Sequence, residues 1–250
     1  MTELRDTRLC GCKGVRFCRL CAGTPRVRSL KFAETVQPNK VDATNGSFTI
    51  DGLLLVPGFI SETEERELCA DIDGVEWLPS QSGRRKQDYG PRVNFKRRKV
   101  KTDRFAGMPK YADFILQQMR CANAERLSDY QPFELCNLEY TPERGSGIEF
   151  HQDDVWIWGN RLISVNLLAG SVMSFIQSTE RIVFAVMPRR SLLCMADECR
   201  YEWKHAILPE HITERRIALT MREPADDFKP GGLLYEQFGR ELFDISSRRI

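Results

Sequence analysis

The residues best suited to metal chemistry lie in the stretch FHQDDVWIWG, which runs from Phe150 to Gly159. His151 and Asp153 are two positions apart, and on an extended strand this spacing directs both side chains to the same face of a sheet. One imidazole and one carboxylate at one spot are two of the three ligands of a mononuclear iron site. Most such triplets are ordinary surface turns, so a further ligand has to be found elsewhere in the chain.

The third ligand has to be sought among the other histidines, because the chain contains only 3 in all. His205 lies in YEWKHAIL, a run with the composition of a strand. His211 lies in LPEHITERR, which is typical of a polar loop. We therefore favour His205 over His211 as the partner of His151 and Asp153.

An anion-binding pattern follows in RRIALTMR, where Arg216 and Arg222 are six positions apart. On a strand this even spacing places both guanidinium groups on one face. Arginine is costly to bury unless it meets an anion, and its planar group suits a carboxylate bidentately. Two inward arginines near a metal therefore indicate a ligand with two carboxylates. The alternative is that each arginine is a rim charge paired with Asp or Glu.

The elements that must position these residues can be predicted from periodicity and turn signals. From Phe133 onward, short apolar runs alternate with turns at a spacing that favours an antiparallel sandwich or barrel over βαβ units. Before them, Ser61 and Glu64 form a capping box that predicts a helix over 61–74, and 108–122 predicts a second helix. The expected fold class is therefore α+β.

A cluster of cysteines stands near the N-terminus in CGCKGVRFCRLC, formed by Cys10, Cys12, Cys18 and Cys21. Four thiolates this close together predict a tetrahedral zinc site. The segment has almost no core of its own, so the metal would hold it together. The alternative is a set of unligated thiols in a flexible arm.

A basic stretch runs from Arg84 to Arg104, with ten Lys or Arg against two Asp, and with Tyr89 and Phe95 between the charges. Basic residues interleaved with aromatic ones suit phosphate contacts together with base stacking, as on a surface for nucleic acid. An acidic protein partner fits the stretch equally well, and a solvated basic hairpin stays open as a third interpretation. The run KRRKVK is also typical of a nuclear-import signal.

Composition excludes several classes of protein. The net charge is only +2 with 29% charged residues, so the chain as a whole is not a basic, nucleic-acid-coating protein. No apolar run approaches the roughly 18 residues that span a bilayer, and the N-terminus lacks the apolar segment of a secretory signal. With 9 cysteines and no such signal, we expect a reduced protein of the cytoplasm and nucleus.

Together, HQD, YEWKHAI and RRIALTMR resemble the AlkB family of iron(II)- and 2-oxoglutarate-dependent dioxygenases. The stretches CGCKGVRFCRLC, SQSGRRKQDYGPRVNF and CNLEYTPERGSGIEFHQDD are similar to the fourth AlkB homologue subfamily of animals. The resemblance covers the N-terminal cysteines and most of residues 48–230. It implies a double-stranded β-helix, or jelly roll, with helices packed on one side, which agrees with the strand-rich interpretation of 133–222.

The resemblance also implies roles for individual residues. The catalytic iron ligands would be His151, Asp153 and His205, and the 2-oxoglutarate contacts would be Arg216, Arg222 and Tyr140. Arg216 would bind the distal carboxylate of the cosubstrate, and Arg222 would lie near its other end. Family members usually carry an asparagine two residues before this tyrosine, where this chain has Leu138. The corresponding region of nucleic-acid-directed members forms a substrate lid, which here would include Arg84, Arg85, Lys86 and Tyr89.

Four segments of the chain follow from these patterns and from the resemblance. They are a four-cysteine zinc knuckle over 1–22, a linker or arm over 23–47, helical support with a basic substrate lid over 48–130, and the double-stranded β-helix core over 131–250. We expect a monomer that does not enter a membrane.

The activity that the resemblance implies is oxidative removal of N-methyl groups with Fe(II), 2-oxoglutarate and O2, and with Zn in the cysteine cluster. The substrate would be methylated lysine in a protein such as actin or actomyosin, or N6-methyladenine in DNA. The rival interpretation is an adaptor, in which an idle jelly roll carries a knuckle and a basic loop that bind nucleic acid or acidic protein. The intact ligands and arginines count against the adaptor.

Overall fold

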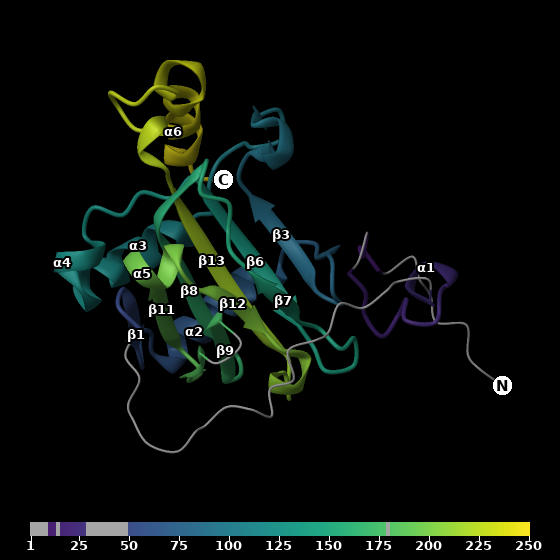
Figure 1. Ribbon diagram of the computed structural model, residues 1–250. Coiled ribbons are helices and arrows are strands. Elements are labelled where there is room, and N and C mark those ends of the chain that lie inside the picture. The colour runs from purple at the N-terminus through teal and green to yellow at the C-terminus, as the bar shows by residue number, and fades with distance from the viewer. Residues whose placement is uncertain (1–9, 14–15, 29–49, 179–180) are drawn as a thin grey trace.

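The computed structural model describes residues 10–13, 16–28, 50–178 and 181–250, and Figure 1 shows their arrangement. Residues 1–9 and 14–15 of the expected knuckle lie outside the described part, as do residues 29–47 of the expected linker. No helix within the described ranges is long and apolar enough to cross a membrane.

Two antiparallel sheets dominate the described residues and face each other (Figure 1). The major, seven-stranded sheet has the order β1-β11-β8-β13-β6-β3-β2. Its strands are β1 (Leu53–Val56), β2 (Leu78–Pro79), β3 (Arg85–Tyr89), β6 (Glu134–Tyr140), β8 (Trp158–Leu167), β11 (Ser191–Met195) and β13 (Arg216–Pro224).

The minor, four-stranded sheet of the described residues has the order β10-β9-β12-β7. Its strands are β7 (Ile148–His151), β9 (Ser171–Ser178), β10 (Arg181–Met187) and β12 (Lys204–Ile207). From β6 to β13 the chain passes back and forth between the sheets, except for the hairpin β9-β10 within the minor sheet, so that the order β7-β12-β9-β10 faces β6-β13-β8-β11. This winding is the double-stranded β-helix, and the predicted fold is confirmed.

Helices flank the sheets. They are α1 (Pro25–Arg28), α2 (Glu62–Asp73), α3 (Tyr111–Ala122), α4 (Ala124–Leu127), α5 (Asp197–Tyr201) and α6 (Arg240–Ser247). The two predicted helices are α2 and α3, and α2 begins with the expected capping box of Ser61 and Glu64. The side chain of Gln87 on β3 donates to the carbonyls of Ile72 and Val75 at the end of α2, at 2.8 and 2.9 Å. This contact ties the helix layer to the major sheet.

A separate hairpin extends beyond β3, formed by β4 (Arg92–Asn94) and β5 (Lys99–Lys101) with a 3₁₀ turn over Phe95–Arg97. Figure 1 shows it beside α6. The hydroxyl of Thr102, just after β5, donates to Glu241 of α6 at 2.7 Å. The predicted basic stretch is therefore divided, with 85–89 inside the major sheet and 92–101 projecting from it.

Candidate metal centre and its pocket

Strands of the minor sheet bring His151, Asp153 and His205 into one cluster. His151 ends β7 and pairs directly opposite His205 on β12, with ring centroids 4.3 Å apart. Asp153 follows in the next loop, and its Oδ1 lies 3.9 Å from Nε2 of His151. One donor atom from each residue lies within 4.8 Å of the others. His211 lies outside this cluster and packs edge-on against Phe184 instead.

The protonation state of the cluster suits a divalent metal. Nδ1–H of His151 donates to the Glu149 carbonyl at 2.8 Å, which leaves Nε2 free as a ligand. Burial lowers the pKa of both imidazoles, to about 3 for His205. Burial opposes the ionisation of Asp153, but the Arg222 guanidinium beside it holds the pKa of that carboxyl well below its usual range. At neutral pH the cluster is therefore two neutral imidazoles and one carboxylate, the donor set of a facial triad.

Arg222 holds the carboxylate of Asp153 in place. Its Nε and Nη2 donate to the two Asp153 oxygens at 3.3 and 3.2 Å. Its Nη1 donates to Glu134 on the neighbouring strand β6, and its guanidinium lies 5.8 Å from the Trp158 ring. The Arg222 guanidinium is thus paired with two carboxylates of the protein, those of Asp153 and Glu134.

Arg216 stands at the other end of the same pocket and has no carboxylate partner among the residues that the structure describes. Its side chain is buried, and the residue is only 1% exposed. Its Nε donates to Oδ1 of Asn166 at 2.5 Å, and its guanidinium lies 4.9 Å from the Tyr140 ring. Its two terminal nitrogens have no hydrogen-bond acceptor among the described residues. A buried guanidinium in this state is costly, and a carboxylate is the group that satisfies it bidentately.

The pocket connects these two ends between the sheets. Tyr140 and Arg216 line one end, the clustered ligands line the other, and apolar side chains such as Leu138, Met173 and Ile207 form the wall. Alternation along β6 places Leu138 in this wall and turns Asn137 to the helix-covered face. There the amide of Asn137 donates to Gln87 at 2.8 Å and to the Tyr111 hydroxyl at 2.6 Å.

Two buried side chains that orient the site carried no signal in the sequence. Arg200, 2% exposed, donates to the carbonyls of Asp153 and Asp154 at 3.0 Å each, and so fixes the loop that carries the carboxylate ligand. Asn166 uses its amide group to bind the carbonyls of Ala169 and Pro188, which turns its oxygen toward Arg216. Neither belongs to a recognisable spacing pattern, and each finds its partners only when distant segments pack.

The residues of the expected lid lie on two faces of the major sheet. Lys86 pairs with Leu138 and shares its pocket-side face, and Arg84 lies 5.9 Å from the Tyr140 ring. Arg85 pairs with Glu139 and Tyr89 with Leu135, so both lie on the helix-covered face. Arg85 binds the Glu139 carboxylate there at 2.5 and 2.7 Å. The structure thus brings two of the four to the pocket side.

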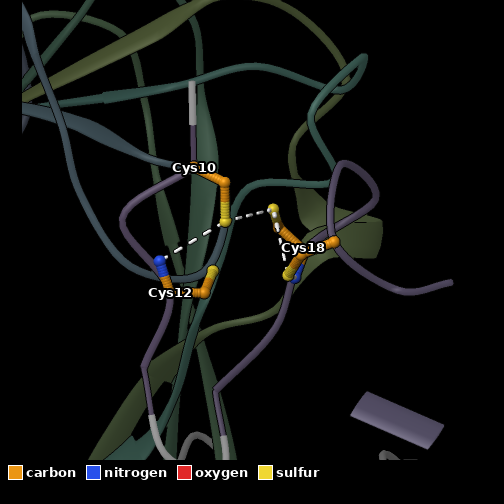
Figure 2. A group of neighbouring side chains, drawn as sticks. Cys10, Cys12 and Cys18 are labelled. Atoms are coloured by element: carbon orange, nitrogen blue, oxygen red, sulfur yellow. Dashed lines mark hydrogen bonds between the residues drawn. The ribbon is translucent and has the colours of Figure 1, made fainter. Parts of the chain in front are cut away.

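The four N-terminal cysteines also form one cluster. Figure 2 shows the sulfur atoms of Cys10, Cys12 and Cys18 turned toward one another. The sulfur of Cys18 lies 3.6 Å from that of Cys10 and 3.9 Å from that of Cys21, and all four sulfurs fall within 4.8 Å of one another. A tetrahedral Zn site with Zn–S bonds of about 2.3 Å separates its sulfurs by about 3.8 Å. All four are free thiols, and their geometry suits a metal ion.

Comparison with known proteins identifies the family. No protein-family model matches the chain. The chain is 50% identical to a DNA N6-methyl adenine demethylase of Caenorhabditis elegans, over 96% of this chain and 95% of that protein. It is 36% identical to the alpha-ketoglutarate-dependent dioxygenase alkB homolog 4 of Homo sapiens, over 96% and 93%. The chain belongs to the AlkB family of 2-oxoglutarate-dependent dioxygenases.

A solved structure, that of OsALKBH1, agrees on the fold of this AlkB-family chain. The two superpose with a TM-score of 0.54 at 12% identity, over 71% of this chain and 99% of that one. AlkB membership implies Fe(II), 2-oxoglutarate and O2 as cofactors. The residues present fit that set, because the triad has the donors for iron and Arg216 has two buried nitrogens without an acceptor in the described part of the chain.

Burial of the imidazoles predicts an acid-sensitive metal-free protein. The pKa of His205 is about 3 in the folded protein, against an ordinary value of 6.5. Below pH 6.5 the unfolded chain therefore binds more protons than the folded one, and the free energy of unfolding decreases as the pH is lowered. From pH 7 to pH 5 we expect His205 to remove roughly 2 kcal/mol from the free energy of unfolding. Urea unfolding of the metal-free protein measures this loss. His205→Gln should make the loss clearly smaller than in wild type, with the part due to His151 remaining, and His211→Gln should keep the full loss. Equal slopes in His205→Gln and wild type would contradict the assignment.

Proposed function

We propose that this AlkB-family chain is an oxidative N-demethylase that acts on N6-methyladenine in DNA. The observation that carries the proposal is the 50% identity, over 96% of the chain, with the Caenorhabditis elegans DNA N6-methyl adenine demethylase. The pocket supports it, since it combines a candidate iron triad with a buried guanidinium that needs an anion.

Within this proposal, each side chain of the pocket has a task. His151, Asp153 and His205 would hold Fe(II), and Arg216 would bind the distal carboxylate of 2-oxoglutarate beside the Tyr140 ring. When bound, iron and 2-oxoglutarate would activate O2 for oxidation of the N-methyl group.

The protein's part is orientation and exclusion of water. Arg222 keeps the Asp153 carboxylate ionised and fixed by pairing with both of its oxygens. Arg200 holds the backbone of the same loop. The apolar wall that includes Leu138 and Met173 would limit access of water to the reacting centre.

The basic hairpin supports a nucleic-acid substrate. The hairpin follows Tyr89, at one end of the major sheet. At that same end Arg222 pairs with Glu134 and with Asp153, so the hairpin lies at the end of the pocket that holds the candidate iron ligands. Phe95 in its turn is 48% exposed to solvent and is followed by three basic residues, Lys96, Arg97 and Arg98. Exposed cations suit DNA phosphates, and an exposed ring suits stacking on a base.

A test of the activity compares the two substrate classes directly. The protein, with Fe(II), 2-oxoglutarate and ascorbate, is incubated with N6-methyladenine oligonucleotides, single- and double-stranded, and with methyl-lysine peptides that include actin sequences. We expect mass spectrometry to show loss of the methyl group from DNA, together with succinate. His151→Ala and Asp153→Ala should lower the rate at least about 100-fold, because each removes a proposed metal ligand. His211→Ala, which alters a histidine outside the cluster, should keep it.

Each other outcome of this comparison has a definite meaning. Demethylation of peptide alone would replace DNA by a protein substrate such as actin or actomyosin. Full activity in His151→Ala would overturn the proposed metal site. A wild-type protein that neither binds Fe(II) nor forms succinate would favour the adaptor that binds nucleic acid or acidic protein.

Arg216 provides a test of cosubstrate binding that does not depend on turnover. With 2-oxoglutarate at about 100 times its dissociation constant, binding should raise the free energy of unfolding of the wild type by about 2.7 kcal/mol. Arg216→Met should show no such gain, because the buried anion partner is gone. Arg215→Met, at the adjacent half-buried arginine that pairs with Asp73 and Glu139, should keep the gain. Thermal unfolding with and without 2-oxoglutarate measures it, and a gain in Arg216→Met would refute the role.

We also propose that the cysteine cluster binds Zn. The sulfur separations of 3.6 and 3.9 Å match a tetrahedral thiolate site, and backbone N–H groups already point at the sulfurs. The N–H of Ser82 donates to the sulfur of Cys12 at 3.1 Å, and that of Cys18 donates to the sulfur of Cys21 at 3.4 Å.

Metal analysis of the purified protein tests the zinc site. We expect one zinc per chain, falling to near zero in Cys18→Ser, because three remaining thiolates hold zinc far more weakly. Cys121→Ser changes an exposed cysteine on α3 and should leave the zinc content unchanged. Wild-type protein without zinc, after expression in zinc-supplemented medium, would refute the assignment.

A further inference from the structure

The cysteine cluster is hydrogen-bonded to the loop from Ser80 to Arg84. The N–H of Gly11, between two of the cysteines, donates to the Ser80 carbonyl at 3.1 Å. The N–H of Ser82 donates to the sulfur of Cys12 at 3.1 Å. Arg19, also in the described part of the knuckle, donates its N–H to the carbonyl of Arg144 at 3.3 Å. The knuckle is therefore hydrogen-bonded to the jelly-roll core rather than only tethered to it.

The loop has a conformation that depends on its neighbours. Ser82 has φ +52° and Gly83 has φ +74°, so two consecutive residues are left-handed. This region is unfavourable for a residue with a Cβ such as Ser82, and it persists only where the surroundings hold it. A Cβ at Gly83 would lie 2.6 Å from the Arg144 carbonyl oxygen and 3.2 Å from the Cβ of Cys18. The cysteine segment is thus one of the surfaces that hold the loop.

Glu149 links the knuckle and the loop to the candidate iron site. Its carboxylate accepts the Ser82 hydroxyl at 2.9 Å and lies 3.6 Å from Nε of Arg16 in the knuckle. Its backbone carbonyl accepts Nδ1–H of His151 at 2.8 Å. One residue of β7 is therefore bound by the knuckle through its side chain and orients a metal-site imidazole through its main chain.

The last residue of the loop reaches the other end of the pocket. Arg84 is 6% exposed and lies 5.9 Å from the Tyr140 ring. That ring in turn lies 4.9 Å from the Arg216 guanidinium. A displacement of the Ser80–Arg84 loop would therefore reach both the imidazole of His151 and the residues around Arg216.

We propose that the metal-loaded cysteine knuckle is a positioning element of the catalytic site, with Arg16, Ser82 and Glu149 as the positioning residues. A metal fixes the four sulfurs, the Cys12 sulfur and Arg16 hold the loop and Glu149, and Glu149 orients His151. Loss of metal from the knuckle would weaken Fe(II) binding without altering any iron ligand. The inference rests on the proposed iron and zinc sites and extends them to a coupling between the two.

The coupling predicts a specific kinetic pattern. In Cys18→Ser and in Ser82→Ala we expect the Fe(II) concentration for half-maximal succinate formation to rise about 5- to 10-fold, at the lower edge of effects from outer-shell partners. The rate at saturating Fe(II) and 2-oxoglutarate should stay within about twofold, because the ligands remain. Lys13→Ala, an exposed knuckle lysine, and Cys121→Ser are the matched controls and should behave as wild type.

Hydrogen exchange gives a readout that needs no turnover. The amides of Ser80 and Gly147 are hydrogen-bonded to Arg84 and Ser82 carbonyls at 2.9 and 3.0 Å. In zinc-free protein, and in Ser82→Ala, exchange should accelerate in peptides covering 80–84 and 147–151, and not in peptides of β8 or β13. Arg16→Ala should raise the Fe(II) requirement and Arg16→Lys should restore it in part, which a purely structural defect would not show.

The outcomes separate this inference from the proposals on which it rests. Zinc-free Cys18→Ser with wild-type Fe(II) requirement and wild-type exchange at 147–151 would overturn the coupling. If Cys18→Ser does not fold, Ser82→Ala and Arg16→Ala, which keep all four cysteines, decide it by the same two measurements. If the wild type forms no succinate, the proposed activity fails, and exchange with and without zinc still decides whether the knuckle holds β7.

Discussion

The ion pair between Arg222 and Asp153 is the interaction on which the site depends. A carboxylate between two packed sheets loses hydration, and the guanidinium that contacts both of its oxygens is the main group that holds its pKa low. Arg222 needs a second anion to complete its own pairing, and Glu134 on the adjacent strand supplies it. The pairing of β13 with β6 places Arg222 beside Glu134, and the loop after β7 of the facing sheet brings Asp153 to the same guanidinium.

The two sheets divide the work of the pocket between them. The minor sheet carries both histidines, directly opposite each other on β7 and β12. The major sheet carries the charges that face them, with Arg222 beside the triad and Arg216 at the far end of β13. The separation between the His151–Asp153–His205 cluster and Arg216 is therefore fixed, because strands within each sheet cannot slide without breaking their hydrogen-bond ladders. Such preorganisation is what a positioning-based catalyst requires.

The N-terminal cysteine cluster is connected to the pocket through contacts with the jelly-roll core. Its Cys12 sulfur accepts the backbone N–H of Ser82 in the Ser80–Arg84 loop, and its Arg16 approaches the strand that ends in His151. The last residue of that loop, Arg84, lies near the Tyr140 ring, and the other neighbour of this ring is Arg216 in the pocket. A segment with almost no core can influence a buried site in this way, because its contacts fall on a loop held in an unfavourable backbone conformation.

The sequence by itself determined the His151–Asp153 pair with His205 as its favoured partner, the arginine pair, the cysteine cluster, helices α2 and α3, and a strand-rich antiparallel core, while the jelly roll followed from the resemblance to the AlkB family. The local signals are a spacing of two on a strand, a spacing of six on a strand, a capping box, helical periodicity over 108–122, and four cysteines close together. Tertiary structure alone decided which face each residue of β3 and β6 occupies, so that Arg84 and Lys86 lie on the pocket side while Arg85 and Tyr89 lie under the helices. It also decided that Arg200 and Asn166 orient the site and that Glu149 links it to the knuckle. These roles come from burial and from contacts between distant segments, and no periodicity of a single chain encodes which segments will meet.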